Sequence, residues 1–306
     1  MPDIVAIGEP MIEFNQTVPG EPRYLQGFGG DTSNFAIAAA RQGARVAYVT
    51  RIGDDAFGRM FLNLWRREGI DTSGVAIDAT AFTAAYFVTH DASGHQFSFL
   101  RSGSAASRMT VGDLPLDLIQ GARFLHVSGI SQAISGTACD AVFAAIETAR
   151  ASGVAVCYDA NLRLKLWPLA RARAVIRETI RLSDYFFPSL DDAQALARKH
   201  RPEAIVDWCF DLGARAVLLK LGEEGVLLAS SPNAKRVHLP GHVVAAVDAT
   251  GAGDCFAGAL VARLAAGDDL SSAARYANAA AAITTMDFGA VAPIPTPAQV
   301  YGLLNG

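Results

Sequence analysis

Residues 248–260, DATGAGDCFAGAL, place one aspartate, Asp254, directly after two glycines, Gly251 and Gly253. The apolar stretch HVVAAV before them predicts a strand, and the alanine-rich residues after them predict a helix. A turn between strand and helix aims unpaired backbone N–H groups outward, and glycine lets that backbone approach an anion closely. The helix dipole adds about half a positive charge there, so the segment predicts a phosphate site.

Asp254 would repel a phosphate unless it has a chemical task beside it. We interpret it as the group that accepts the proton of an attacking hydroxyl next to the transferred phosphate. The helix dipole predicts that its pKa stays low, and a late proton transfer would suffice for such a weak base. The alternative is that Asp254 only caps the helix, which is expected to end near Gly267. A Walker loop is excluded because the chain contains no Gly-Lys pair.

A second glycine cluster, residues 27–44, also opens a predicted helix. Gly29 and Gly30 lie at its entry, and Asp31 and Asn34 fall in its first turn. Polar side chains at such a position can bind the hydroxyls of a sugar. Taken alone, the segment is equally well explained as a capped helix after a tight turn. The two clusters together favour a site for a sugar and a phosphate.

The elements that must position these residues alternate along the chain. Amphipathic spacing predicts a helix over 55–68, and Ser135 is a suitable N-cap for another that runs to Gly153. Short apolar runs between such helices are typical of strands buried on both faces of a parallel sheet. We therefore expect an α/β fold, a doubly wound and mostly parallel sheet with helices on both faces. The predicted strands are 4–8, 46–53, 124–129, 154–160, 184–189 and 216–222.

Two segments interrupt this alternation. Residues 82–101 contain two aromatic-rich stretches around DASG, a turn signal for an antiparallel hairpin. We expect this hairpin and residues 10–27 to form a small β-sheet lid. Because no linker or repeat separates them from the rest, residues 1–306 are predicted to form a single domain.

The composition excludes several classes of function. With 51% hydrophobic residues the chain can bury a large core, and its net charge of −4 includes no basic run that would track nucleic acid. The four cysteines lie far apart, so neither a CxxC pair nor a zinc knuckle is present, and reduced thiols are expected. A basic leader and a long apolar stretch are both missing from the sequence. We expect a soluble, cytoplasmic protein without membrane or nucleic-acid partners.

Residues 29–58 and 248–260 resemble the two signatures of the ribokinase-like carbohydrate kinases of the phosphofructokinase-B type. The resemblance covers the whole chain. It implies a roughly nine-stranded sheet, a lid that often serves as a dimer surface, and transfer of the γ-phosphate of ATP to a primary alcohol. It also implies roles for named residues: Asp254 as catalytic base, the N–H groups of Gly251, Ala252 and Gly253 as anion hole, and Gly30, Asp31 and Asn34 as sugar ligands.

Within that family, several segments look most like 2-keto-3-deoxygluconate kinases. Arg101 on the lid and Arg163 after a central strand could converge on the carboxylate of a sugar acid. The alternatives are a solvated lid side chain for Arg101 and a surface ion pair for Arg163. Tyr86 on the lid is a further candidate substrate ligand, although an aromatic residue on a half-buried strand commonly serves packing. The segments are residues 8–16, 97–107, 124–130 and 159–168.

The nucleotide contacts follow from the same resemblance. The resemblance implies that Lys220 lies by the nucleotide phosphates, but Lys220 is equally well explained as a structural strand residue. Mg²⁺ is expected to bind mainly through the phosphates and waters, with Asp192 as a possible ligand through water. Ser189 and Asp192 stand where the family commonly has the Asn and Glu of Asn-x-x-Glu, so the usual metal role of that motif is in doubt. The implied ATP contacts are Ser189, Lys220, Gly222, Gly251, Gly253 and Asn278.

Three functions are compared on these grounds. The favoured one is an ATP-dependent kinase for the 6-hydroxyl of 2-keto-3-deoxygluconate, and the runner-up is a fructokinase or another neutral-sugar kinase. A non-catalytic, sugar-sensing regulator is disfavoured by the intact Asp254 and anion loop. Some relatives use a monovalent cation, which Asp248 could support. A homo-oligomer formed through the lid is expected.

Overall fold

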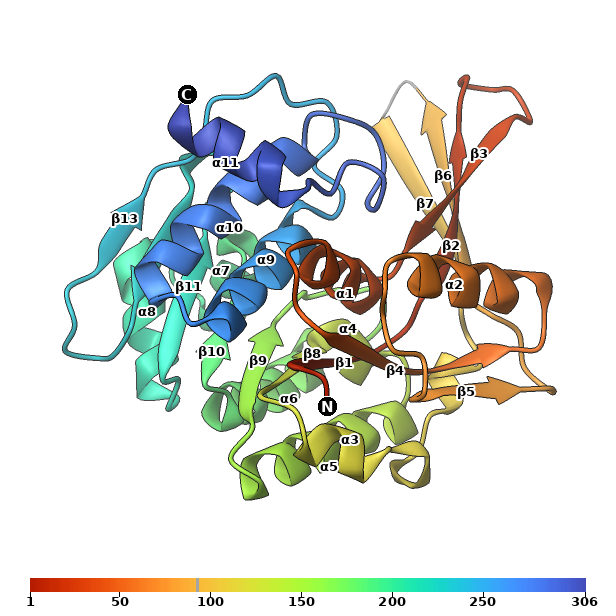
Figure 1. Cartoon of the computed structure of the whole chain (residues 1–306), viewed down its shortest axis with the longest axis horizontal. Coiled ribbons are helices and arrows are strands. Elements are labelled where there is room, and N and C mark those ends of the chain that lie inside the picture. Colours follow the sequence, from red (N-terminus) through yellow and green to blue (C-terminus); the bar gives the residue numbers. More distant parts are fainter. Residues whose placement is uncertain (92–93) are drawn as a thin grey trace.

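Short apolar runs form the central sheet of the computed structural model (Figure 1), which describes residues 1–91 and 94–306. Within those residues the sheet has nine strands in the order β13-β12-β11-β10-β9-β8-β1-β4-β5. They are β1 (Ile4–Ile7), β4 (Val46–Gly53), β5 (Val75–Asp78), β8 (Phe124–Ser128), β9 (Ala155–Asp159), β10 (Tyr185–Phe186), β11 (Ala216–Lys220), β12 (Val226–Ala229) and β13 (Val237–Leu239).

The strands from β5 to β11 pair in parallel, whereas β12 pairs antiparallel with both β11 and β13. After β1 the chain proceeds to β4 and β5 on one side, and then returns to β8 and continues to β11 on the other. The order therefore reverses between β1 and β8. In an open α/β sheet such a reversal creates a crevice at the carboxyl ends of the strands, where ligands bind.

The predicted strands are confirmed, with one shortened. The run at 184–189 contributes only the two residues of β10, after which Pro188 and Ser189 lead into a helix. The sequence analysis missed β5, β12 and β13, which lie at the two ends of the sheet. Strands β5 and β13 are partly exposed, so they lack the continuous apolar run of a central strand.

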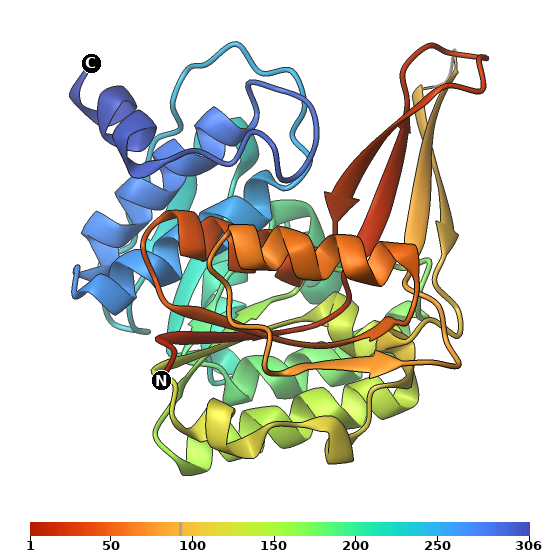
Figure 2. The same cartoon turned by 45° about the vertical axis from the view of Figure 1, so that its right-hand side comes forward.

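Helices cover both faces of the sheet, as Figure 2 shows from a second direction. On one face α1, α2, α9 and α10 share a core with the sheet, and α11 packs on α10. On the other face α3, α5, α6, α7 and α8 do so, and α4 packs on α5. The bounds are α1 (Asp31–Arg41), α2 (Ala56–Arg67), α3 (Leu116–Gln120), α4 (Gly129–Ala133), α5 (Gly136–Ala151), α6 (Leu169–Leu182), α7 (Leu190–Ala197), α8 (Pro202–Asp211), α9 (Ala252–Ala266), α10 (Leu270–Thr284) and α11 (Pro297–Asn305).

The helix predictions are confirmed in both position and capping. The side chain of Asp55 accepts a hydrogen bond from Gly58 N at the start of α2. Ser135 caps α5 by accepting from Ala138 N. Gly267 ends α9 in the left-handed conformation, with a φ of 101°. In the described part of the chain, no helix combines the length and the apolarity needed to cross a bilayer.

The lid is a separate four-stranded sheet in the order β3-β2-β6-β7. Its hairpin is confirmed by the pairing of β6 with β7, while the centre of the DASG turn, residues 92–93, lies outside the described residues. Figure 1 shows the lid rising from the body beside α2. Its strands are β2 (Met11–Gln16), β3 (Tyr24–Gly29), β6 (Ala85–Asp91) and β7 (Gly94–Leu100).

The strand predicted from HVVAAV is wrong. Residues 240–250 form no regular element, and Val243 is fully exposed. The sheet ends at β13, just before this segment, so these residues have no further strand to pair with. An irregular connection, and not a strand, therefore leads into the glycine turn before α9.

Candidate active site

The predicted anion site lies at the first turn of α9. Gly251 precedes the helix with a φ of 78°, and a Cβ there would lie 2.9 Å from the carbonyl oxygen of Ala290. The Lys220 ammonium lies beside this turn, because a Cβ on Gly253 would be 3.2 Å from Lys220 Nζ. The helix N-terminus and the ammonium together form a positive site suited to phosphate. The N–H of Ala252, however, already donates to the carbonyl of Ala249 over 3.2 Å, which reduces its predicted share in the anion hole.

Asp254 follows in the same turn, and a residue of α1 forms a hydrogen bond with its side chain. Its Oδ2 accepts a hydrogen bond of 2.8 Å from Asn34 Nδ2. Burial, followed by the negative charge of Asp31, raises the pKa of Asp254 to about 8. The low pKa expected from the helix dipole is therefore wrong, because desolvation and a neighbouring carboxylate outweigh about half a unit charge.

Close contact between α1 and α9 joins the two glycine clusters. A Cβ on Gly258 would lie 2.5 Å from the carbonyl oxygen of Phe35 and 2.7 Å from Ala38 Cβ. Only glycine permits this approach. The approach places the first turn of α1, with Asp31 and Asn34, next to Asp254.

Gly30 shapes the entry to α1 through its backbone. Its φ is 99°, and a Cβ there would lie 2.3 Å from the carbonyl oxygen of Glu9. Gly30 therefore lets two chain segments meet at the predicted sugar site, and a side chain at this position would separate them.

Three predicted sugar ligands carry buried polar atoms without a hydrogen-bond partner. They are Asp31 Oδ1, Asn34 Oδ1 and Arg101 Nε, three of six such side-chain atoms among the described residues. Buried polar atoms are normally hydrogen-bonded, and exceptions call for an explanation. A polyhydroxylated ligand would supply the donors and acceptors that these atoms lack.

Arg101 lies at the end of β7 and forms a buried ion pair with Glu9. Glu9 is 1% exposed and also accepts a hydrogen bond of 2.6 Å from Ser104 Oγ. Burial raises the pKa of Glu9 even though Arg101 opposes the shift. Arg101 is thus not a solvated lid side chain.

Arg163 differs from Arg101 in being exposed. Its Nη1 donates to the carbonyl of Leu162 over 3.0 Å. Its positive charge opposes the rise in the pKa of both Asp31 and Asp192, which places Arg163 near the same site. No direct contact links the two arginines among the interactions described.

Tyr86 lies on the face of the lid that is turned toward the site. It is buried and donates a hydrogen bond to Glu13 on the neighbouring strand β2. Burial, followed by the charge of Glu13, raises the pKa of Tyr86, and the charge of Asp254 contributes as well. Tyr86 therefore packs within the lid and also lies near the carboxylate of Asp254.

Lys220, at the end of β11, forms an ion pair of 2.5 Å with Asp159 at the end of β9. Ser189 caps α7 by accepting from Asp192 N, and Asp192 Oδ2 accepts from Leu162 N over 3.0 Å. Burial raises the pKa of Asp192. This carboxylate therefore holds the loop after β9, and that bond competes with a metal role.

The other two nucleotide candidates lie beyond the ends of the strands. Gly222 follows β11 with a φ of 64°, and Asn278 on α10 donates to the carbonyl of Pro240 over 2.7 Å. Asp248 holds the turn before α9 through hydrogen bonds to Thr250 and to Gly289 N. In the part of the chain that the structure describes, no cluster of His, Cys, Asp and Glu is arranged to bind a metal.

Four buried residues of the site were missed by the sequence analysis. Their signal was present, because they lie in GEPMIEF and DANLR, two of the segments singled out by resemblance. What was not evident was that each carboxylate has a specific partner: Glu9 with Arg101, Glu13 with Tyr86, and Asp159 with Lys220. The residues are Glu9, Glu13, Asp159 and Asn161.

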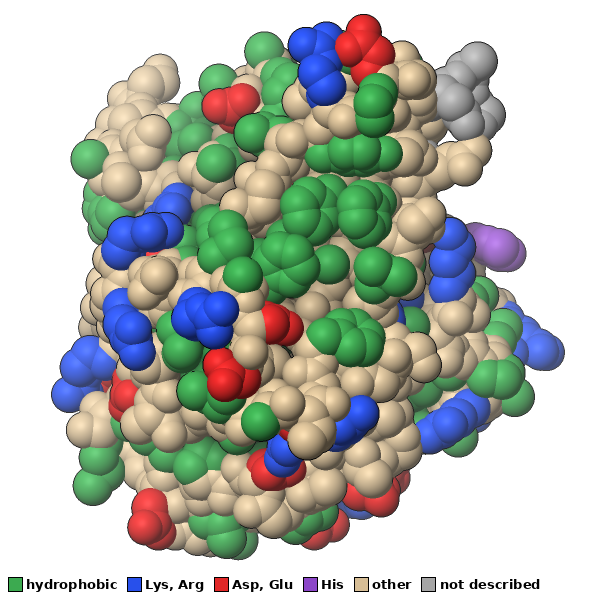
Figure 3. All heavy atoms as spheres, turned by 90° about the vertical axis from the view of Figure 1, so that its right-hand side faces the viewer, with side chains coloured by type: hydrophobic (Ala, Val, Ile, Leu, Met, Phe, Trp, Pro, Cys, Tyr) green, Lys and Arg blue, Asp and Glu red, His purple; other side chains and the backbone are tan. Residues whose placement is uncertain are grey.

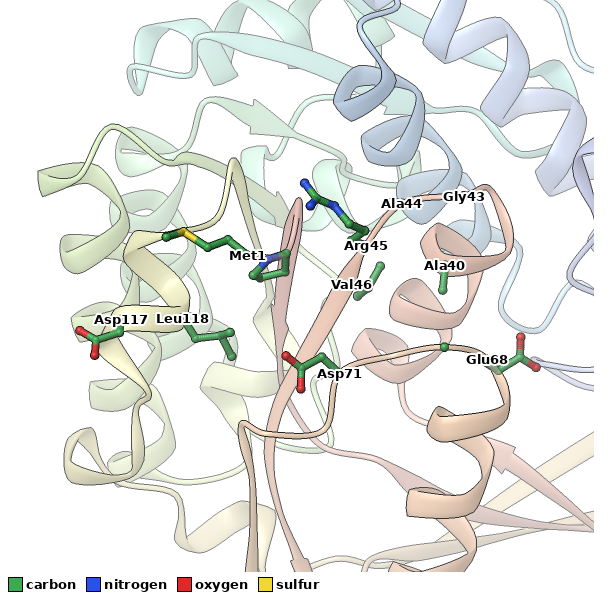
Figure 4. Close-up of a pocket in the computed structure, with 12 residues that line it drawn as sticks. Met1, Ala40, Gly43, Ala44, Arg45, Val46, Glu68, Asp71, Asp117 and Leu118 are labelled. Atoms are coloured by element: carbon green, nitrogen blue, oxygen red, sulfur yellow. The ribbon is translucent and has the colours of Figure 1, made fainter.

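An open cavity of about 710 Å³ lies at the opposite edge of the sheet (Figure 4). It is lined by the start of β4 and the ends of α1 and α2, whereas the site uses the start of α1 and the ends of the strands. The charges of Arg45 and Glu68, which line it, are paired with Asp3 and Arg41. This cavity is separate from the candidate active site.

Comparison with known proteins agrees with this geometry. Residues 1–297 match the family described as pfkB family carbohydrate kinase. The chain belongs to the pfkB family of carbohydrate kinases. It is 35% identical to fructokinase-2 of Solanum habrochaites over 99% of this chain and 96% of that protein. It is also 35% identical to 2-dehydro-3-deoxygluconokinase of Thermoproteus tenax over 100% of this chain and 95% of that protein.

The fold of this pfkB family kinase also matches that of a solved structure. The fructokinase of Vibrio cholerae O395, determined with fructose, ADP and calcium ion bound, superposes with a TM-score of 0.90 at 29% identity. The match covers 99% of each chain. The ribokinase-like fold, with its large sheet and separate small sheet, is thus confirmed.

Proposed function

We propose that this pfkB family kinase transfers the γ-phosphoryl group of ATP to the 6-hydroxyl of 2-keto-3-deoxygluconate. The observation that carries the proposal is the buried Arg101 Nε, which has no hydrogen-bond partner. Arg101 pairs with Glu9, and the charge of Asp31 acts on that carboxylate, so the guanidinium lies near a candidate sugar ligand. A carboxylate or keto oxygen of a sugar acid would accept that hydrogen bond.

In this proposal Asp254 accepts the proton of the attacking hydroxyl while the oxygen attacks the γ-phosphorus. The bond from that phosphorus to the β,γ-bridging oxygen breaks, and ADP leaves. The first turn of α9 and Lys220 stabilise the charge on the transferring oxygens. Asn34 holds Asp254 in place through its amide.

The cofactors follow from the chemistry of the donors. An ATP triphosphate fits the positive site formed by the start of α9 and Lys220. Mg²⁺ would be held mainly by the phosphates and water, with Asp192 reaching it only through water because Leu162 N occupies one of its oxygens. A monovalent cation near Asp248 stays a proposal.

Arg163 supports a sugar acid as substrate. It is exposed beside Asp31 and Asp192, so its guanidinium is available for a carboxylate at the mouth of the site. The Thermoproteus tenax relative, by its name, acts on an acid of this kind.

Fructose is the second candidate, favoured by a different observation. The charge of Arg101 is already balanced by Glu9, and the carboxyl groups of Asp31 and Asp254 lie nearby. A neutral sugar would enter such a site without repulsion. Relatives named as fructokinases are as similar to this chain as the Thermoproteus tenax protein.

The deciding experiment measures kcat/KM with Mg-ATP for 2-keto-3-deoxygluconate, fructose, ribose and adenosine. We expect the sugar acid to be preferred, and Arg163→Ala to reduce its kcat/KM by about 10-fold or more while fructose turnover hardly changes. Equal or greater turnover with a neutral sugar overturns the acid-sugar proposal. If the parent protein phosphorylates none of these compounds, a sugar-sensing regulator is favoured.

A further inference from the structure

Asp159 lies between the two halves of the site, at the carboxyl end of β9. It is 4% exposed, and its Oδ2 accepts the 2.5 Å ion pair from Lys220 Nζ. Its Oδ1 accepts a hydrogen bond of 3.1 Å from the backbone N–H of Asn161. One buried carboxylate thus fixes both a lysine on another strand and the turn that follows its own strand.

The ion pair joins the ends of two strands that are not neighbours in the sheet. Strand β10 lies between β9 and β11 in the sheet, so Lys220 must reach across two strand spacings, about 10 Å. The segment after β10 stays between its neighbours, since Phe187 N donates to the carbonyl of Tyr158 and Lys220 N donates to that of Pro188. It enters α7 directly after Ser189. The long lysine side chain then crosses to Asp159, and its ammonium comes to lie beside Gly253.

Asn161 extends the same turn toward the sugar side. It is 9% exposed and has a φ of 34°, a left-handed conformation that is uncommon for a residue other than glycine. In that conformation its Nδ2 donates a hydrogen bond of 2.9 Å to Asp31 Oδ2. Unusual backbone at a site persists where surrounding contacts fix it.

We propose that Asp159 and Asn161 are positioning residues: Asp159 holds the Lys220 ammonium beside the anion turn, and Asn161 holds the Asp31 carboxylate toward the sugar. One turn after β9 would then set the phosphate-binding and sugar-binding groups relative to each other. The inference rests on the proposed contact between Lys220 and the nucleotide phosphates.

The electrostatics of Asp254 provide a readout that packing alone would not change. The groups that face Asp254 are Asp31 on α1, Asp159 on β9 and Lys220 on β11, with Tyr86 on the lid nearby. Asp159 raises the pKa of Asp254, and Lys220 lowers it. Replacing Asp159 by asparagine should therefore lower that pKa, both directly and by freeing Lys220.

The test is a double-mutant cycle with Asp159→Asn and Lys220→Met. We expect Lys220→Met to raise KM for ATP, and Asp159→Asn to lower kcat/KM for ATP by roughly 10- to 100-fold, the usual effect of removing a partner that orients a site group. In the Lys220→Met background, Asp159→Asn should add little. The acid limb of the pH profile should move to lower pH in Asp159→Asn.

Asp184→Asn is the matched control. Asp184 is also an acidic partner of β9, since it accepts from Val156 N and pairs with Arg215, but it lies at the opposite end of the strand. The Asp184→Asn variant should have the same kcat/KM for ATP as the parent. Additive effects of Asp159 and Lys220, or an unmoved acid limb, overturn the proposal for Asp159, whereas no effect of Lys220→Met on KM for ATP contradicts the proposed phosphate contact itself.

Asn161→Gly tests the sugar side without straining the backbone, because glycine accepts a φ of 34° readily. It removes the amide that holds Asp31 and leaves the ion pair between Asp159 and Lys220 intact. We expect kcat/KM for the sugar to fall by about 10-fold while KM for ATP stays unchanged. Unchanged sugar kinetics, or an equal loss toward ATP, would show that Asn161 does not position Asp31.

Discussion

At the scale of single residues, the chemistry depends on when Asp254 is ionised. Burial and the charge of Asp31 raise its pKa to about 8, and a proton acceptor must be ionised to act. We therefore expect kcat/KM to rise as the pH increases through about 8. In Asp31→Asn a like charge is removed, so the pKa of Asp254 falls and this rise moves to lower pH. A pH profile of the residual activity measures the shift, and a displacement to higher pH would contradict this account.

Replacing Asp254 should affect catalysis and stability differently. Asp254→Asn should reduce kcat by roughly 10²- to 10⁴-fold, the usual contribution of a general base. Because the folded-state pKa lies above the ordinary value of 3.8, the unfolded chain releases the Asp254 proton at lower pH than the native protein does. This difference lowers stability as the pH rises from about 4 to about 8. The variant should therefore unfold at no lower urea concentration than the parent at pH 8. An unreduced phosphorylation rate would mean that another group accepts the proton.

At the scale of secondary-structure elements, the contact between α1 and α9 builds the site. Gly258→Ala would place a methyl group 2.5 Å from the carbonyl oxygen of Phe35 and force the two helices apart. We expect a loss of about 1–3 kcal/mol in the free energy of unfolding. Because Asn34 would move away from Asp254, kcat should fall as well. Urea denaturation and initial rates measure the two effects.

Gly136→Ala serves as the control for this substitution. Gly136 opens α5, and nothing lies within 4 Å of a Cβ at that position. Alanine is favoured over glycine in helices, so this variant should be as stable as the parent or slightly more so. If Gly258→Ala behaved in the same way, the close approach of α1 and α9 would not be what sets the site.

At the scale of the whole molecule, the lid leaves apolar side chains exposed on its two edge strands. Leu25 on β3 is 64% exposed and Leu100 on β7 is 58% exposed, and Phe97 and Phe99 are exposed beside Leu100. Figure 3 shows hydrophobic side chains grouped on this side of the molecule. Unpaired edge strands with such side chains favour association, so we expect a homodimer through the lid.

Sedimentation of the double variant Leu25→Asp and Leu100→Asp tests this expectation. The parent should sediment as a dimer and the variant as a monomer, because the charges would be buried at the interface. Ile77→Asp is the control, since Ile77 is 60% exposed on β5 of the central sheet, outside the lid. A parent that sediments as a monomer at micromolar concentration would refute the dimer.

The sequence by itself determined the central strands, several helices and the candidate site residues at two helix starts. Buried strands and capped helices follow from local patterns, since apolar runs and capping residues act over a few positions. The glycine turn before Asp254 and the helix start at Asp31 were evident for the same reason. Edge strands such as β5, and the irregular segment 240–250, were not predicted because their conformation depends on which neighbours they find.

The tertiary structure alone decided the partners and the ionisation of those residues. Asn34 and Asp254 are 220 positions apart, and Lys220 and Asp159 come from strands that are not neighbours in the sheet. The pKa of Asp254 followed burial and a carboxylate from another helix, and not the dipole of its own helix. Hydrogen bonds, desolvation and charge interactions depend on distances in space, and packing sets those distances between segments that are remote in the sequence.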